Sequence, residues 1–249
     1  MVTVAQNMDA LPIDLPRSPM HGFRGEPSQL PMPVRPRGLT VCISREAGAR
    51  GGSIARRVGE QLGWQVYNQE MLGYLSQNEV ARQEVLADIP LAAHAWIDGQ
   101  LARLSSVTGR SAADWEAAEL IRLIFGLAIR GEAIIVGRGA GALLPIETTL
   151  NVRIVAPVEQ RVAYMSQWLR LPMDEASHEV ASRDRVRAAW HTALANRELT
   201  DLSQYDLVLN AGRLGVAACA ELIAEAVRGK HHPSESTAAN GDWPVVDPV

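Results

Sequence analysis

The sequence has few cysteines and no apolar run long enough to cross a membrane. Cys42 and Cys219 are its only cysteines, which excludes a disulfide framework or a cysteine-rich zinc site. The longest apolar stretches have the length of strands and are interrupted by charges and glycines. The N-terminal segment lacks the basic-then-apolar order of a signal peptide. We therefore expect a cytoplasmic protein with no membrane partner.

The chain also lacks an excess of positive charge. Its formal net charge is -4 at pH 7 and its pI is about 5.9. Such a balance gives no broad attraction to nucleic acid, although local arginine clusters still bind phosphate. These values favour small-molecule partners over nucleic acid, and they do not predict an oligomeric state.

The length and composition are those of one sizeable α/β domain. The chain has 249 residues, of which 47% are hydrophobic. Residues 1–37 are rich in proline and show no periodic apolar pattern, which predicts a flexible leader. Residues 229–249 are rich in Ser, Pro, Gly and Asn and predict a disordered tail. The folded domain is therefore expected at 38–228.

Short apolar runs alternate with helical patterns inside this domain. Buried parallel strands are predicted at 39–44, 133–137, 152–156 and 206–210, with a weaker one at 64–67. The first helical pattern ends at Gly63, where a glycine cap is expected. The region 70–130 is almost wholly helical in pattern. This alternation predicts a parallel sheet covered on both faces, with ligands at the carboxyl ends of the strands.

A glycine-rich turn joins the first predicted strand to the first predicted helix. The stretch ISREAGARGGSIARR (43–57) has the order of a phosphate-binding P-loop, in which backbone N–H groups surround phosphates. It fails the consensus G-x-x-x-x-G-K-[ST], because Gly51 stands at the lysine and Gly52 at the hydroxyl position. The glycines still permit close backbone approach, and the helix N-terminus still attracts anions. The predicted phosphate-binding residues are Arg45, Gly48, Ala49, Arg50, Gly51, Gly52 and Ser53.

Arginines surround this loop where the consensus has a lysine. Arg45, Arg50 and Arg56 lie within about a turn of it, and a guanidinium group binds phosphate through paired hydrogen bonds. Our hypothesis is that Arg50, beside the lysine position, supplies part of the missing charge. The alternative is an ordinary glycine-rich turn with solvated arginines.

Two further motifs follow in the sequence. IIVGRGAGALLP and LNVRIVAPVEQRV lie between Ile134 and Val162, and SRDRVRAAW spans 182–190. Together with the loop, they resemble the cytidylate kinase-like branch of the P-loop nucleoside monophosphate kinases. The second motif is similar to the family's G-R-D turn and A-S-P-E-x-R helix start, and the third to its arginine-rich lid. The resemblance covers about residues 40–227.

The resemblance implies a three-layer α/β P-loop kinase fold, with a helical insertion at about 70–130 that closes over the acceptor. It implies transfer of the γ-phosphoryl group of ATP, with Mg²⁺, to a pyrimidine nucleoside monophosphate. Arg138 matches the arginine that binds the acceptor. Asp184 and Arg187 match the catalytic lid residues, and Arg183 flanks them. Arg138 in a surface turn, and an ordinary ion pair between Asp184 and Arg187, remain the alternatives.

Three positions depart from the family pattern. Gly139 replaces an aspartate, and Val136 and Asn68 stand where related chains carry acidic residues. Carboxylates that organise magnesium or the acceptor in the family are thus absent, and Glu46 or Asp184, acting through water, is the alternative, so the metal ligands stay unassigned.

The first functional hypothesis is an ATP-dependent kinase for CMP or dCMP. A non-catalytic nucleotide-binding pseudokinase with a degenerate P-loop is the alternative, and a kinase for another small metabolite is a further one.

Overall fold

The computed structural model describes residues 38–108, 118–195 and 197–231. The predicted leader, and the predicted tail beyond His231, lie outside these residues. A parallel five-stranded sheet with the order β2-β3-β1-β4-β5 forms the centre of the described part. Its strands are β1 (Thr40–Arg45), β2 (Gln65–Tyr67), β3 (Ala133–Val136), β4 (Thr149–Val155) and β5 (Leu207–Asn210).

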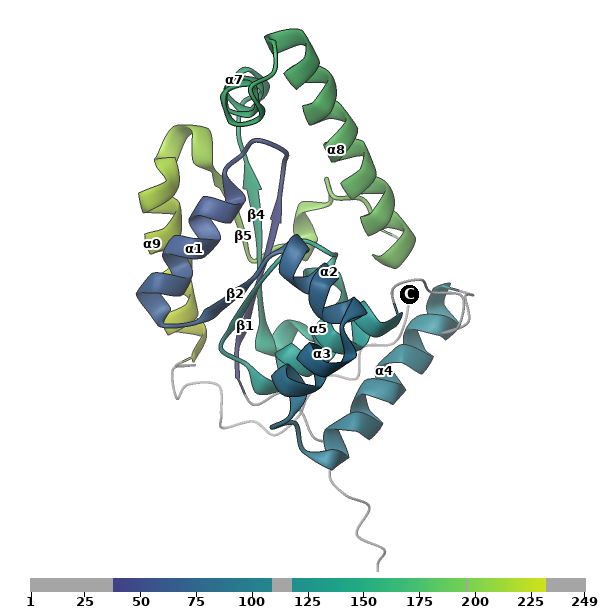
Figure 1. Cartoon of the computed structure of the whole chain (residues 1–249). Helices are drawn as coiled ribbons and strands as arrows, with labels where there is room; N and C mark the ends of the chain where they lie inside the picture. Colours follow the sequence, from purple (N-terminus) through teal and green to yellow (C-terminus); the bar gives the residue numbers. More distant parts are fainter. Residues whose placement is uncertain (1–37, 109–117, 196, 232–249) are drawn as a thin grey trace, which may run out of the picture. The chain divides into compact units, whose positions relative to one another are not determined.

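Helices cover both faces of this sheet (Figure 1). On one face lie α1 (Gly51–Leu62) and α9 (Ala211–His231), which contact each other and the strands. On the other face lie α5 (Ala118–Arg130), α6 (Ala140–Leu143) and α8 (Met173–Ala195). The predicted three-layer α/β fold with a central parallel sheet is therefore confirmed.

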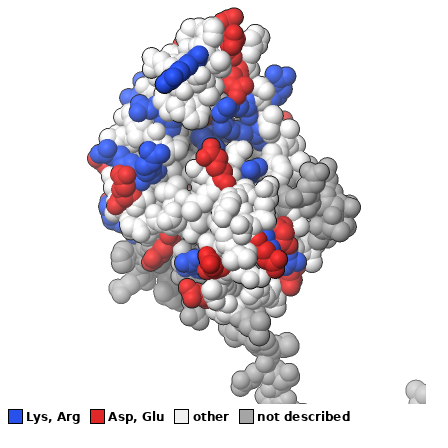
Figure 2. Space-filling view, viewed as in Figure 1, with Lys and Arg blue, Asp and Glu red and all other residues white. Residues whose placement is uncertain are grey.

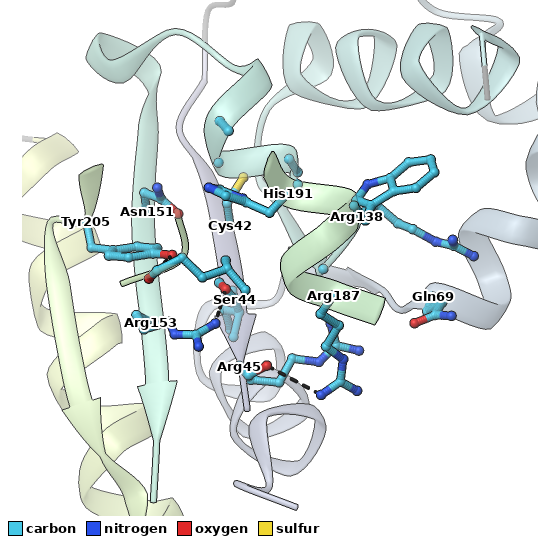
Figure 3. A pocket seen from close by; sticks show the side chains of 18 of the residues that line it. Cys42, Ser44, Arg45, Gln69, Arg138, Asn151, Arg153, Arg187, His191 and Tyr205 are labelled. Atoms are coloured by element: carbon cyan, nitrogen blue, oxygen red, sulfur yellow. Dashed lines mark hydrogen bonds between the residues drawn. The ribbon is translucent and has the colours of Figure 1, made fainter. Parts of the chain in front are cut away.

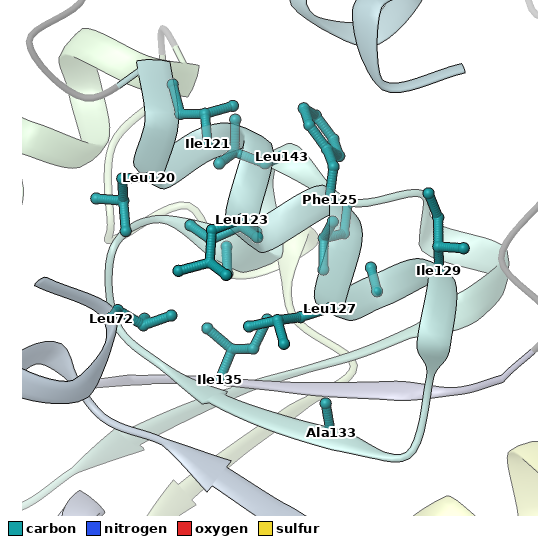
Figure 4. Close-up of a cluster of buried hydrophobic side chains, with 14 of the residues drawn as sticks. Leu72, Leu120, Ile121, Leu123, Phe125, Leu127, Ile129, Ala133, Ile135 and Leu143 are labelled. Carbon is teal, nitrogen blue, oxygen red and sulfur yellow. The ribbon is translucent and has the colours of Figure 1, made fainter. Parts of the chain in front are cut away.

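The helical region predicted at about 70–130 lies between β2 and β3. It contains α2 (Gln69–Gln77), α3 (Glu79–Leu86), α4 (Leu91–Thr108) and α5. Phe125 and Leu123 of α5 are fully buried and pack with Leu72 of α2 and Ile135 of β3 in one core cluster (Figure 4). The insertion is thereby joined to the sheet through apolar side chains. Its closure over an acceptor stays a prediction.

Helix ends follow the local sequence signals. Gly63 adopts a left-handed conformation (φ 69°) after α1 and caps it, as predicted. Asn68 accepts a hydrogen bond from the Met71 backbone N–H at 2.8 Å and so caps α2. α9 continues to His231, past the boundary predicted at residue 228. No helix among the described residues combines the length and apolar character needed to cross a membrane.

The remaining elements connect the motifs of the second half. α7 (Val158–Leu169) follows β4, and the short 3-10 helices are η2 (Ile146–Thr148) and η3 (Leu202–Gln204). Every predicted strand is present, within three residues of its predicted bounds. β4 begins at Thr149, earlier than predicted, because its first residues are polar on alternate positions and do not read as an apolar run.

Candidate functional site

The loop between β1 and α1 is shaped by glycine. Gly48 has φ 80°, and a Cβ atom there would collide with the backbone carbonyl of Arg161. Arg50 is also left-handed (φ 60°) and provides no side-chain cap for α1, which begins at Gly51. The first N–H groups of α1 are therefore available to an anion, at the positive end of the helix dipole.

The side chain of Arg45 occupies the place from which a P-loop lysine would extend. A Cβ atom at Gly51 would lie 2.8 Å from Cβ and 2.9 Å from Cγ of Arg45. The guanidinium end continues to Gly137, where an added Cβ would meet Nη1 of Arg45. The only lysine in the sequence, Lys230, is bound to the Thr149 carbonyl at 2.6 Å. The side chain of Arg45 thus packs against Gly51, which aligns with the P-loop lysine, and the substitution of the lysine charge by Arg50 stays a prediction.

Most of the predicted phosphate-binding residues line one cleft of about 450 Å³. Arg50 lies at its edge, with its guanidinium carbon 5.7 Å from the ring centre of Tyr164. Ala49 does not line this cleft; it is buried and borders a neighbouring pocket beside α7. The members of the predicted set that line the cleft are Arg45, Gly48, Arg50, Gly51, Gly52 and Ser53.

Asp184 connects α8 to the loop. Its Oδ1 accepts a hydrogen bond from the Ala47 N–H at 2.7 Å, and its Oδ2 accepts one from Arg161 Nη1 at 2.7 Å. Arg161 also donates to the Ala47 carbonyl at 3.1 Å and lies 3.3 Å from a carboxylate oxygen of Glu46. Asp184 is therefore engaged in holding the loop against α7 and α8.

The two arginines predicted beside Asp184 point to different partners. Arg187 lies 3.7 Å from Asp184 and donates to the Arg45 carbonyl at 3.4 Å, so it faces the end of β1. Arg183 is bound to Glu179 at 2.6 Å along the same helix, at the border of the cleft. Of these two arginines of α8, Arg187 is thus the one that contacts the end of β1.

Arg138 lies in the turn between β3 and α6. Gly137, Arg138 and Gly139 all have positive φ angles, of 85°, 57° and 67°. Arg138 Nε is buried and has no hydrogen-bond partner, and burial lowers the pKa of this arginine. A buried donor without a partner is costly, so this turn is built around a group that a ligand can satisfy.

A second pocket, of about 110 Å³, opens at the carboxyl ends of β1, β3 and β4 (Figure 3). Its lining includes the guanidinium groups of Arg45, Arg138, Arg153 and Arg187. No Asp or Glu belongs to this lining among the residues that the structure describes. Burial and the charges of Arg187, Arg138 and Arg153 lower the pKa of Arg45 to about 10.

The arginines give one face of the molecule a marked positive character. Figure 2 shows blue side chains gathered around a hollow in the upper part of this face, with a few red side chains beside them. The cleft and the second pocket share Arg45, Gln69 and Arg187. Two spaces lined by arginines therefore meet at the end of β1.

Several residues of this arrangement were missed from the sequence. Arg161 lay within a recognised motif, but nothing in the sequence showed that it would hold the loop. Arg153, His191 and Tyr205 were not singled out either. A usable signal existed for Arg153: TLNVRIV (149–155) alternates polar and apolar residues, whereas a parallel strand buried on both faces is normally apolar throughout.

The residues that depart from the family pattern have local roles here. Asn68 caps α2, Val136 is buried in the core at the cleft, and Gly139 begins α6. No group of three or more His, Cys, Asp or Glu suited to a metal ion occurs in the described ranges. Glu46 is bound to Arg161, while Glu70 also lines the cleft.

Known proteins share this sequence pattern and fold. Cytidylate kinases of Ignicoccus hospitalis and Staphylothermus marinus are 28% and 21% identical over 102 and 187 residues, which are 41% and 75% of this chain. These stretches are 59% and 95% of the two relatives, so the chain spans less than two thirds of the former. A crystal structure of an uncharacterized protein from Eubacterium ventriosum has the same fold, with 16% identity and a TM-score of 0.54 over 78% of this chain and 99% of that one.

The model of the cytidylate kinase-like family matches residues 40–213. This range contains the loop, the Arg138 turn and the α8 arginines described above. The chain belongs to the cytidylate kinase-like family.

Proposed function

We propose that this protein transfers the γ-phosphoryl group of ATP to the phosphate of a nucleoside monophosphate, with CMP and dCMP as the first candidates. The observation that carries the proposal is the junction of two anion-binding spaces at Arg45 and Arg187. A donor phosphate chain in the cleft and an acceptor phosphate in the pocket would meet between these two guanidinium groups.

The cleft is assigned to the phosphates of ATP. Backbone N–H groups at the start of α1 bind them, and Arg45 supplies the charge that a P-loop lysine supplies elsewhere. When bound, Mg²⁺ supplies charge neutralisation on the phosphate oxygens. The phosphates would carry most of its ligands, together with the hydroxyl of Ser53 and the carboxylate of Glu70, both of which line the cleft.

The pocket is assigned to the acceptor, and its chemistry favours a phosphate over a hydroxyl as the attacking group. A hydroxyl needs a base to remove its proton; no carboxylate lines the pocket within the described residues, and His191, which does line it, is bound to Gln204 at 2.8 Å. A phosphate monoester is already largely ionised at pH 7, with a second pKa of about 6. Its oxygen attacks the γ-phosphorus, the bond to the β-phosphate oxygen breaks, and ADP leaves.

Arginines then stabilise the charge that is shared during transfer. Arg187 touches the backbone at the end of β1, and Arg138 projects from the adjacent turn (Figure 3). In this assignment Asp184 is a positioning residue, because its oxygens are bound to Ala47 and Arg161. Positioning and electrostatic stabilisation are the main contributions a protein makes to phosphoryl transfer.

The test is transfer from γ-labelled ATP, with Mg²⁺, to CMP, dCMP, UMP, AMP and a set of small alcohols. Labelled nucleoside diphosphate is the expected product, and Arg187→Ala should form much less of it. ATP binding without transfer to any acceptor would instead identify a nucleotide-binding module. Transfer only to alcohols would identify a kinase of another metabolite class.

A further inference from the structure

The inner wall of the acceptor pocket is polar where a parallel sheet is usually apolar. Cys42 and Ser44 of β1 and Asn151 and Arg153 of β4 all line it, two positions apart on each strand. The register pairs Cys42 with Asn151 and Ser44 with Arg153, so these four side chains share one face of two neighbouring strands. The opposite face of the same strands packs into an apolar core.

Arg153 has little to bind within the fold. Its Nη1 donates to Ser44 Oγ at 2.8 Å, and no ion pair involves it within the described part of the chain. A guanidinium group has five N–H donors, so most of those on Arg153 remain for a ligand. In Figure 3 this side chain lies on the inner wall, away from Arg138 and Gln69 at the other side of the pocket.

The nearby acidic groups are already engaged elsewhere. Asp206 accepts from the Asn151 N–H at 2.7 Å and lies 3.4 Å from Lys230. Asp184 is bound to Arg161 and Ala47. Arg153 is therefore a partly buried cation that has no acidic partner among the residues that the structure describes.

The remaining wall groups are held in fixed positions. His191 is 5% exposed and lies 2.8 Å from Gln204 Oε1, and burial lowers its pKa, so it adds no positive charge at neutral pH. Tyr205 donates its hydroxyl hydrogen to the Leu199 carbonyl at 3.2 Å. Arg153 is thus the charged group of an otherwise neutral wall.

The charges of the pocket exceed what one phosphate can balance. A phosphate monoester carries between one and two negative charges at pH 7. Under the proposed function, Arg138 and Arg187 bind the acceptor phosphate and Arg45 binds the donor phosphates. Arg153 then has no anion to bind if the acceptor carries a single phosphate. Leaving a partly buried guanidinium without a counter-charge is unfavourable.

We infer that the acceptor carries a second anionic group, a carboxylate or a further phosphate, which is bound by Arg153 on the inner wall. This inference rests on the proposed function and ranks nucleoside monophosphates with a second anionic group above CMP and dCMP, which carry only one. Arg153 is accordingly the residue that selects among acceptors.

The test compares matched acceptors that differ by one anionic group. UMP and orotidine 5′-monophosphate differ by a carboxylate on the ring, and CMP and cytidine 3′,5′-bisphosphate differ by a phosphate on the sugar. Their dissociation constants are measured by calorimetry without ATP, on the wild-type chain and on Arg153→Met. In at least one pair, the dissociation constant of the wild-type protein for the doubly anionic acceptor should be lower by a factor of about 10 or more. The pair that shows the preference identifies the group that is bound.

Arg153→Met should abolish that preference while leaving the affinity for the singly anionic member nearly unchanged. Arg153→Lys should keep part of the preference, because it keeps the charge without the paired donors. Arg228→Met is the matched control, since Arg228 is exposed on α9 and pairs with Glu225. Arg228→Met should retain the full preference.

Equal binding within both pairs would overturn the inference. If Arg153→Met weakened the binding of both acceptors of a pair equally, Arg153 would have a structural role and the inference would also be overturned. An undiminished preference of Arg153→Met for the doubly anionic acceptor would overturn it as well. The proposed function is tested separately by transfer. Phosphoryl transfer to these acceptors, without tighter binding of the doubly anionic ones, would refute this inference alone. Tighter binding of a doubly anionic acceptor without phosphoryl transfer would refute the kinase activity alone.

Discussion

Replacing Arg45 by methionine should stabilise the ligand-free protein and weaken its binding of ATP. The structure places the Arg45 side chain under Gly51 and its guanidinium beside Gly137, among Arg138, Arg153 and Arg187. Burial and these like charges lower the pKa of Arg45 to about 10. That value is ~2.5 pKa units below the ordinary one, which corresponds to about 3 kcal/mol of cost for the charged form.

Methionine keeps an unbranched stem next to Gly51 but removes the charge. Because some packing and hydration of the guanidinium are lost as well, we expect a net gain of about 1 to 3 kcal/mol in the free energy of unfolding. For a protein of this size, each kcal/mol raises Tm by about 2 to 4 °C. The measurement is the thermal melting of wild-type and Arg45→Met protein without ligand at pH 7.

The gain should depend on pH in a defined direction. The folded protein binds the Arg45 proton less tightly than the unfolded chain does, so the wild-type free energy of unfolding rises as the pH increases through about 10. Arg45→Met lacks this contribution. Its advantage over the wild type should be fully present between pH 7 and 9 and should shrink above pH 10.

Ligand binding should respond in the opposite way. ATP at a hundred times its dissociation constant stabilises a protein by about 2.7 kcal/mol, and much of this increase in Tm should be lost in Arg45→Met. Arg50→Met is the control, because Arg50 is exposed over Tyr164 and should bring no gain in stability. A variant Arg45→Met that melts at lower temperature than the wild type and keeps the full ATP-induced increase would refute the assignment of Arg45 as the substitute for lysine.

Three further predictions test the loop and the lid. Gly52→Val should fold, because no atom lies within 4 Å of an added Cβ, yet weaken ATP binding about tenfold or more by filling the cleft; unchanged affinity in calorimetry would remove the phosphate-binding role of the loop. Arg187→Ala should lower kcat by about 10² while changing the ATP dissociation constant little, since its charge acts mainly during transfer; equal losses in steady-state kinetics and binding would contradict this. Asp184→Asn should lower the free energy of unfolding in urea by about 1 to 2 kcal/mol, because Arg161 loses the closer of its two charged partners and keeps only Glu46, while the Ala47 N–H keeps an acceptor; an unaltered midpoint would show that Asp184 does not hold the loop.

Local patterns were sufficient for the elements and their order. Short apolar runs separated by helical periods predicted all strands of the sheet, and Gly63 marked the end of α1. The glycines of the loop predicted a sharp strand-to-helix turn, which Gly48 makes with a positive φ. These features depend on neighbouring residues and on the solvation of side chains, so they can be derived from the sequence by itself.

The position of Arg45 beside Gly51 and Gly137 could be seen only in the packed structure. Arg50 is adjacent to Gly51 in sequence and lies over Tyr164 at the cleft, whereas the side chain of Arg45, from the end of β1, packs against Gly51. A long side chain can reach many positions from one backbone site. Sequence distance therefore does not decide which guanidinium lies under the helix N-terminus.

The same limit applies to Asp184 and Arg153. A spacing of three residues suggested that Asp184 and Arg187 pair on one helix face, yet the closer partners of Asp184 are Ala47 and Arg161, which are distant in sequence. Arg153 becomes a pocket residue only because β4 lies beside β1 and turns its polar face toward α8. The sequence by itself determined the strands, the helices and the glycine-rich turn between β1 and α1, since these follow from local chemistry. Only the tertiary structure decided which arginines share a pocket, because that depends on the pairing of strands far apart in the chain.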